Sequence, residues 1–174
     1  MARLNGRTQT EAFEAAKMIW EDPDTSLERA LISTLRNGRR PLNRAAAAYA
    51  TQLLKTPGII AALERTVGDK TERPRVRGKA AEALAHGHRK RSHKVLLKGL
   101  NDPSKEVRFW CAFALGEMAE RRAIAALRRL TESDRRVVRG FHSVSKEASD
   151  ALVNIEADKR RHRRKDGCVF CIRA

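Results

Sequence analysis

The sequence predicts an all-α protein, a right-handed α-solenoid of about five stacked antiparallel helix pairs. The dipeptides Val76-Arg77, Val107-Arg108 and Val138-Arg139 are 31 residues apart each time. A similar alanine- and leucine-rich sequence follows each of them, after a short insertion in the third copy. A fixed period in the low thirties is typical of repeat proteins, whose units bury their apolar faces only against neighbours. Aromatic residues make up 5% of the chain, which suits close helix packing. No run of five or more residues alternates apolar and polar side chains, so strands are not predicted.

Amphipathic segments follow one another along the whole chain. The expected helices cover residues 8–21, 26–37, 41–54, 59–67, 74–85, 92–100, 104–118, 121–131 and 143–160. The first pair matches the repeat pattern least, as a terminal capping unit does. Its first helix carries Trp20 on the apolar face, and Asn37-Gly38 ends its second helix. Pro41 and Pro57-Gly58 precede the helices of the next pair, because proline fits a first helical turn or a preceding turn.

The later helix boundaries follow from the same residue types. Pro74 opens one helix, the basic turn 86–91 ends it, and Asp102-Pro103-Ser104 starts the helix two further along. The last helix continues the third repeat copy after the short insertion that interrupts it. We therefore expect one solenoid domain over residues 1–158, with a capping pair over 1–40 and repeat units over 41–158, followed by a basic, flexible tail over 159–174.

Two sequence motifs resemble those of a known family. One is Asp-Pro-x-x-x-Val-Arg-x-x-x-Ala-x-Ala-Leu-Gly (Asp102 to Gly116), and the other is Ala-x-x-x-Leu-x-x-Leu (Ala123 to Leu130). The chain resembles the HEAT-repeat superfamily, in particular the short bacterial type related to phycobilisome-lyase repeats, well over 73–155 and loosely over 41–69. The resemblance implies the fold but leaves function open, because the superfamily includes scaffolds, lyase subunits and nucleic-acid enzymes.

Acidic and basic residues recur in step with the repeat. An aspartate precedes each of three successive units, at Asp69, Asp102 and Asp134. An arginine stands inside each unit, at Arg77, Arg108 and Arg139. An aspartate at such a position caps the free N–H groups of a helix start, and an arginine pairs with a neighbouring unit. We therefore assign both series to the architecture rather than to acid–base catalysis.

The net charge of +16 is concentrated in two segments. Residues 73–102 carry nine Lys and Arg against two Asp and Glu, and residues 135–174 carry eleven against five. Localised positive charge attracts polyanions or acidic protein faces and speeds encounter with them. The partner is therefore expected to be an acidic protein, with nucleic acid as the alternative.

The expected partner-binding residues lie on the second helices of the repeat pairs. Aligning these helices on Leu63, Leu97 and Leu127 places those leucines in the core. In the family that the chain resembles, the second helix lines the concave surface, which implies a basic groove. The residues expected to form it are Arg89, Lys90, Arg91, Lys94, Lys98, Arg128 and Arg129.

The tail supplies a second basic cluster. Its expected polyanion-binding residues are Lys159, Arg160, Arg161, Arg163, Arg164 and Lys165. Such a block repels itself and is typical of a phosphate-binding arm, although a solubility tail has the same composition. It contains no aromatic side chain, so any nucleic-acid contact would involve the backbone rather than the bases.

Metal and catalytic signatures are weak. Cys168 and Cys171 form one Cys-x-x-Cys pair, to which His162 adds a third weak candidate, whereas a structural zinc site needs four ligands. Cys111 fits the core, and Trp110 fits the core or a groove lining. No His-Glu dipeptide of the kind found in HEAT-like hydroxylases occurs, and no aspartate follows Trp110 by one turn as in HEAT-like glycosylases. No cofactor, metal or catalytic residue is predicted.

These observations favour a non-enzymatic interaction scaffold that binds an acidic protein segment in a basic concave groove. Sequence-independent binding of a DNA or RNA backbone by the same groove and the tail is the first alternative. A lyase-type or other enzyme subunit is the weaker one. No small-molecule substrate or membrane contact is predicted, and the lack of a signal peptide or an apolar span favours a cytoplasmic location.

Overall fold

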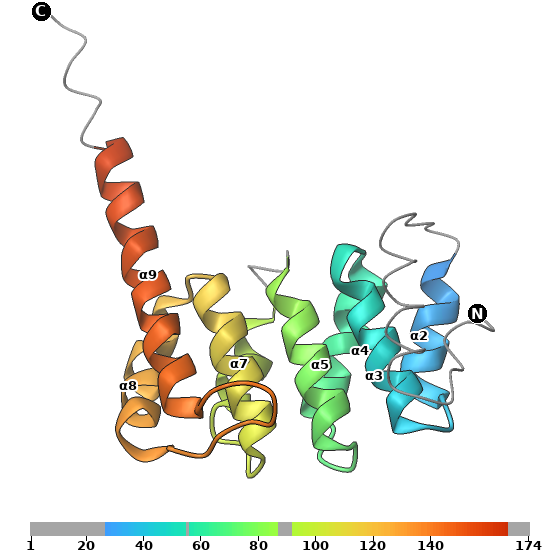
Figure 1. Ribbon diagram of the computed structural model, residues 1–174. Coiled ribbons are helices and arrows are strands. Elements are labelled where there is room, and N and C mark those ends of the chain that lie inside the picture. The colour runs from blue at the N-terminus through green and yellow to red at the C-terminus, as the bar shows by residue number, and fades with distance from the viewer. Residues whose placement is uncertain (1–26, 55, 87–91, 167–174) are drawn as a thin grey trace, which may run out of the picture.

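The described part of the chain consists of helices stacked in series. The computed structural model describes residues 27–54, 56–86 and 92–166. Its helices, in chain order, are α2 (Glu28–Asn37), α3 (Pro41–Ala50), η3 (Thr51–Leu53), α4 (Pro57–Gly68), α5 (Pro74–Ala85), α6 (His93–Gly99), α7 (Lys105–Glu117), η4 (Arg121–Ala123), α8 (Ile124–Ser133) and α9 (Val144–Asp166). Figure 1 shows the series running from α2 to α9, whose far end projects beyond its neighbours.

The α-helices form two rows. In the first row α3, α5, α7 and α9 pack side by side, and in the second row α2 contacts α4 and α4 contacts α6. Each second-row helix, α8 included, also packs on the first-row helix that follows it in the chain. The described residues contain no strand, and their β-type pairing is confined to a bridge between Val137 and Ser143. The predicted all-α solenoid is confirmed.

Proline and the N-cap determine where several helices begin. The helices α3, α4 and α5 have proline in their first turn, at Pro41, Pro57 and Pro74. The side chain of Thr56 accepts a hydrogen bond from the Ile59 N–H at 3.2 Å and so satisfies one free donor of α4. At the other end, α9 continues to Asp166, beyond the predicted end at residue 160. The basic residues from 159 to 165 are therefore helical.

The core is made of leucine and alanine, as the composition suggests. Leu63, Leu96 and Leu127 are fully buried on α4, α6 and α8, whereas Leu97 is only partly buried against the core. The alignment on Leu97 was therefore wrong by one residue, and Leu96 is the true equivalent of Leu127. Cys111 is fully buried, as predicted, and its burial raises the pKa of the thiol to about 12.

Buried ion pairs connect successive units. Arg77 donates to both carboxylate oxygens of Asp102, and its Nε and Nη2 each donate to the Val67 carbonyl at 3.1 Å. Asp102 also accepts the Ser104 N–H at 3.0 Å, just ahead of α7. Burial alone would raise the pKa of Asp102, but the hydrogen bonds from Arg77 and Lys70 outweigh it and lower the pKa. The assignment of this pair to the architecture is confirmed.

The next unit repeats this arrangement. Arg108 Nε lies 2.6 Å from Asp134 Oδ2, and the exposed Arg136 Nε lies 2.7 Å from the other oxygen. Burial works to raise the pKa of Asp134, and the hydrogen bonds from Arg136 and Arg108 lower it. The third arginine differs, because Arg139 is exposed in the turn before α9. Its assignment to the architecture was wrong.

Candidate partner-binding groove

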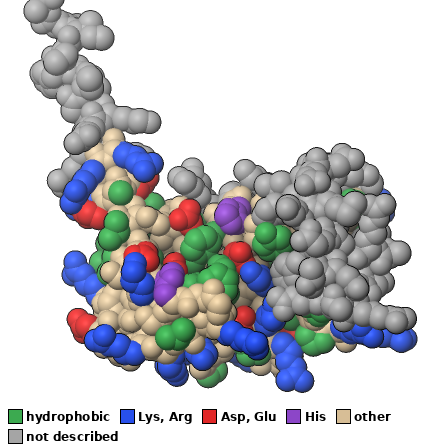
Figure 2. Space-filling model, in the orientation of Figure 1, with side chains coloured by type: hydrophobic (Ala, Val, Ile, Leu, Met, Phe, Trp, Pro, Cys, Tyr) green, Lys and Arg blue, Asp and Glu red, His purple; other side chains and the backbone are tan. Residues whose placement is uncertain are grey.

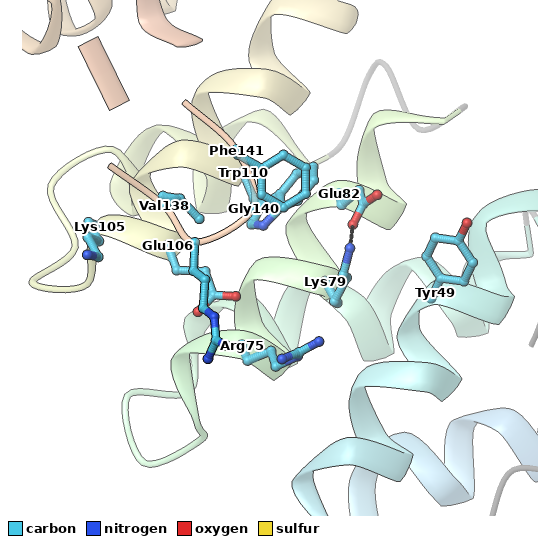
Figure 3. Close-up of a pocket in the computed structure, with 11 residues that line it drawn as sticks. Tyr49, Arg75, Lys79, Glu82, Lys105, Glu106, Trp110, Val138, Gly140 and Phe141 are labelled. Atoms are coloured by element: carbon cyan, nitrogen blue, oxygen red, sulfur yellow. Dashed lines mark hydrogen bonds and ion pairs between the residues drawn. The ribbon is translucent and has the colours of Figure 1, made fainter. Parts of the chain in front are cut away.

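A groove of about 770 Å³ opens on the first row of helices. It lies between α3, α5, α7 and the loop that precedes α9, and we call it the α5–α7 groove. Its lining residues are Tyr49, Arg75, Lys79, Glu82, Lys105, Glu106, Trp110, Val138, Arg139, Gly140 and Phe141. Figure 3 shows Lys79 between Tyr49 on one side and Trp110 with Phe141 on the other.

Helical spacing places the walls of the groove. On α5, Arg75, Lys79 and Glu82 are three or four residues apart, so they share one face. On α7, Glu106 and Trp110 share a face in the same way, and the two helices pack against each other. The groove is therefore a product of the repeat stacking.

A glycine on α5 allows the tryptophan to lie in the groove. A Cβ atom added to Gly78 would stand 2.7 Å from Trp110 Cδ1 and 3.4 Å from Glu106 Cγ. Any larger residue would push the indole away, so the lack of a side chain at Gly78 positions the ring. Trp110 is only 5% exposed yet lines the groove, which confirms that it belongs both to the core and to the groove lining.

Lys79 is held in the middle of the groove. Its Nζ lies 4.6 Å from the Trp110 ring centroid and 5.5 Å from that of Tyr49, which are cation–π distances. The same nitrogen pairs with Glu82 Oε2 at 2.5 Å. Burial, and then the charge of Glu82, raise the pKa of Tyr49. Lys79 is therefore already engaged by three side chains of the protein itself.

An aromatic cluster forms one wall. The Trp110 ring meets the Phe141 ring edge-on at 5.0 Å between centroids and the Phe113 ring at 5.6 Å. Phe109 lies 5.2 Å from Trp110 and 5.4 Å from Phe141. Phe141 nevertheless remains 49% exposed. The wall thus offers an apolar ring that is anchored from behind and open towards solvent.

The loop before α9 carries that ring. Gly140 has a φ of 83°, in the left-handed region that glycine adopts without steric cost. The Phe141 N–H donates to the Val138 carbonyl at 2.9 Å, and the Val138 N–H donates to the His142 carbonyl at 3.1 Å. His142 Nε2 lies 2.8 Å from Glu147 Oε2 on α9. The loop is thereby fixed to the last helix.

The groove has a cationic rim and two half-buried acids, Glu82 and Glu106. Arg75, Lys105 and Arg139 are exposed around it. Burial raises the pKa of Glu106, and the charges of Arg75, Lys79 and Lys105 act in the opposite direction. On the face shown in Figure 2, Lys and Arg side chains gather along the lower edge, below a group of hydrophobic side chains.

The predicted binding residues that the structure describes lie outside this groove. Lys94 and Lys98 are exposed on α6, Arg128 and Arg129 are exposed on α8, and none of the four lines the α5–α7 groove. Arg89, Lys90 and Arg91 fall outside the described residues. The structure thus places the described members of the predicted set on the second row, while the groove opens on the first.

The tail residues are placed only in part. Lys159 is half-buried and Arg160 is exposed, each with a nitrogen 3.9 Å from a Glu156 carboxylate oxygen, and Arg161 is exposed. The predicted residues His162, Arg163, Arg164 and Lys165 lie on the last turns of α9. Cys168 and Cys171 fall outside the described residues, so the weak metal prediction stays open. Within the described chain, no three His, Cys, Asp or Glu side chains are grouped as metal ligands would be.

The sequence contains a pattern that could have located the groove, namely one position that recurs in each repeat and lines it. Lys79, Trp110 and Phe141 each stand two residues after the arginine of a Val-Arg dipeptide, and all three line the groove. The prediction compared the second helices with one another and did not follow this column along the first helices.

One comparison with known proteins is informative. Residues 69–141 match the family model of HEAT repeats. The matched segment contains α5 to α8 and the loop up to Phe141. This match supports the HEAT-repeat superfamily, whose members generally act as protein-interaction scaffolds. It does not single out the phycobilisome-lyase type, which stays a prediction. No curated protein matches the chain. Among the described residues, no helix has the length and apolar character needed to cross a bilayer.

Proposed function

We propose that the protein is a non-enzymatic interaction scaffold that binds an acidic segment of a protein partner in the α5–α7 groove. The observation that carries this proposal is the exposed triad of Arg75, Lys105 and Arg139 around an aromatic wall. Interfaces are enriched in aromatic residues and arginine, and complementary charge sets specificity and the rate of encounter. The groove offers both features on a rigid helical frame.

The electrostatics support an anionic ligand. Lys79 is neutralised by Glu82, so the rim cations are the charges that an incoming carboxylate meets first. Two of the three rim cations are arginines, whose planar guanidinium groups hold a carboxylate through two parallel hydrogen bonds. Glu82 and Glu106 limit the net positive charge of the groove. This favours a peptide with separated carboxylates over a continuous polyanion.

Charge reversal on each row tests the proposal. A peptide whose glutamates are separated by glycine residues is the probe, and its binding to the full chain is measured by calorimetry near physiological salt. Arg75→Glu with Arg139→Glu should abolish binding, whereas the matched pair Lys98→Glu with Arg128→Glu should leave most of it. The reverse result would move the site to the second row. No binding to the unaltered protein would refute the proposed function.

Nucleic-acid binding is the second candidate, and the exposed cations of α6, α8 and α9 are the observation that favours it. A binder of the phosphate backbone shows log affinity falling with log salt by about 0.9 per duplex phosphate contacted. Duplex binding that persists near physiological salt and weakens in Lys98→Glu with Arg128→Glu, and again on deletion of residues 159–174, would support this candidate. Random duplexes should then bind about equally, because only backbone contacts are expected.

A further inference from the structure

The aromatic wall of the groove bears on what kind of acidic segment fits. Resting on the proposed function, we infer that the bound segment carries an aromatic side chain flanked by carboxylates. Its ring docks on Phe141 beside Trp110, and its carboxylates reach the rim cations. The groove therefore selects an aromatic anchor as well as charge.

The exposure of Phe141 is the first step in this argument. Single exposed apolar side chains are common on protein surfaces. Phe141 differs because it lines a groove and because two buried rings, Phe109 and Trp110, fix it from behind at 5.4 and 5.0 Å. A ligand ring placed on it would lose water from both surfaces without having to immobilise a flexible side chain of the protein.

The geometry of the cluster favours a ring over an aliphatic side chain. Trp110 meets Phe141 at an interplanar angle of 80° and Phe113 at 86°. Such edge-to-face contacts are favourable because a ring has a negative face and a positive edge. A ligand ring on the open side of Phe141 would extend the same pattern. Aromatic side chains are also the residues that most often dominate interface energies.

Flanking carboxylates follow from where the cations stand. Arg139 lies two residues before Phe141 in the same loop, while Lys105 and Arg75 come from the starts of α7 and α5. Figure 3 shows these two side chains below Phe141 and Trp110 in the view, with Lys105 on the side away from Tyr49. An anchor on Phe141 therefore has cations beside it, within reach of acidic neighbours in the ligand chain.

The acids of the groove favour a peptide over a nucleic acid as the source of the ring. The Glu106 carboxylate lines the groove and can accept hydrogen bonds from backbone N–H groups. A peptide offers such a donor at almost every residue, whereas a DNA backbone offers no hydrogen-bond donor and brings a negative phosphate at every nucleotide towards a negative acid. A base stacked on Phe141 would bring those phosphates close to Glu106.

The test uses Trp110 as an internal reporter. Trp20 is the other tryptophan of the chain, so Trp20→Phe leaves Trp110 as the source of tryptophan emission. Three synthetic peptides share flanking glutamates and differ at the central residue, which is Phe, Leu or Ala; in a fourth, the Phe peptide has glutamines instead. Binding is measured by fluorescence titration and by calorimetry on the full chain.

The Phe peptide should bind at least about tenfold more tightly than the Ala peptide and should shift the Trp110 emission, as expected for a hot-spot anchor. The Leu peptide should fall between them, and the glutamine peptide should bind weakly. Phe141→Ala should remove the advantage of Phe over Ala, and Phe141→Leu should reduce it while keeping apolar bulk behind the loop. Val153→Ala, at an exposed valine on α9, should change nothing.

Two failures can be told apart. Equal binding of the Phe and Ala peptides, lost on reversal of Arg75 and Arg139, would overturn the aromatic anchor and leave the proposed function standing. An absence of binding by every acidic peptide would overturn both. A single-stranded oligonucleotide that shifts Trp110 emission more strongly than the Phe peptide would also overturn the inference. Circular dichroism of each variant confirms that it is folded.

Discussion

The arginines of the three Val-Arg dipeptides occupy two different environments. Arg77 and Arg108 are buried inside α5 and α7, and each pairs with the aspartate that precedes the next unit. Arg139 stands in the same register but is exposed on the rim of the α5–α7 groove. The same two-residue pattern therefore links units in two repeats and contributes to a candidate binding surface in the third.

Helical context explains the difference. Arg77 and Arg108 follow the starts of their helices, which point the side chains towards the adjoining unit. In the third copy, Arg139 lies in a turn with Gly140 at positive φ, and α9 begins only at Val144. The inserted loop thus removes the arginine from the inter-unit position. A repeat with an insertion is a place where an architectural residue becomes available for another role.

The largest expected contrast is in stability. Arg108→Ala should lower the free energy of unfolding by about 3 kcal/mol, because it leaves the buried Asp134 without its buried partner. Arg139→Ala should change it by no more than about 0.5 kcal/mol, as exposed positions do. Urea unfolding followed by circular dichroism measures both. Similar losses in the two variants would show that the arginines are equivalent after all.

Replacing the two glycines that shape the groove, Gly78 and Gly140, should have different effects on stability and on the position of Trp110. Gly78→Ala should cost roughly 1–3 kcal/mol, since its Cβ would meet Trp110 at 2.7 Å and must displace the ring. Gly140→Ala meets nothing within 4 Å, so only the positive φ opposes it, at roughly 1–2 kcal/mol. Trp110 emission in the Trp20→Phe background separates them. It should change for Gly78→Ala and stay the same for Gly140→Ala.

Acid should weaken the paired units. The folded state lowers the pKa of Asp102 and Asp134 below the ordinary value of 3.8. Their contribution to stability is therefore present above pH 3.8 and is lost as the pH falls through the lower folded values. Thermal unfolding at a series of pH values should show this loss. In Asp134→Asn the loss on acidification should be smaller, because that variant has already lost the charged pair.

The smallest effect should come from Glu106. Its pKa is raised on folding, so it contributes stability below about its ordinary value of 4.5, and this is lost as the pH rises through the folded value. Glu106→Gln should therefore be slightly more stable than the parent at neutral pH. It should also bind the peptide with separated glutamates roughly threefold to tenfold more tightly, because one repelling charge is gone while the amide oxygen can still accept a peptide N–H. Weaker binding would show that the ligand needs the charged carboxylate of Glu106.

The sequence predicted the fold well because periodicity and proline report directly on helices. The start of α5 at Pro74 and the burial of Cys111 could both be predicted from the residues immediately around them. The candidate site was harder, since it depends on which row of helices is hollowed. Charge counts led to Lys98 and Arg128 on the second row, while the groove formed where Gly78 lets Trp110 lie between neighbouring helices. That gap is a property of packing, which no single segment specifies.

The spacing of the inter-unit pairs has a consequence for folding. Glu28 with Thr56, Glu64 with Ser92 and Arg77 with Asp102 are separated by 28, 28 and 25 residues, so each joins neighbouring units only. Chains held together by such local contacts fold quickly and can fray from one end without losing the rest. The groove, however, needs Tyr49 on α3 and Phe141 beyond α8 at the same time. A ligand held there would make units that otherwise unfold separately unfold together.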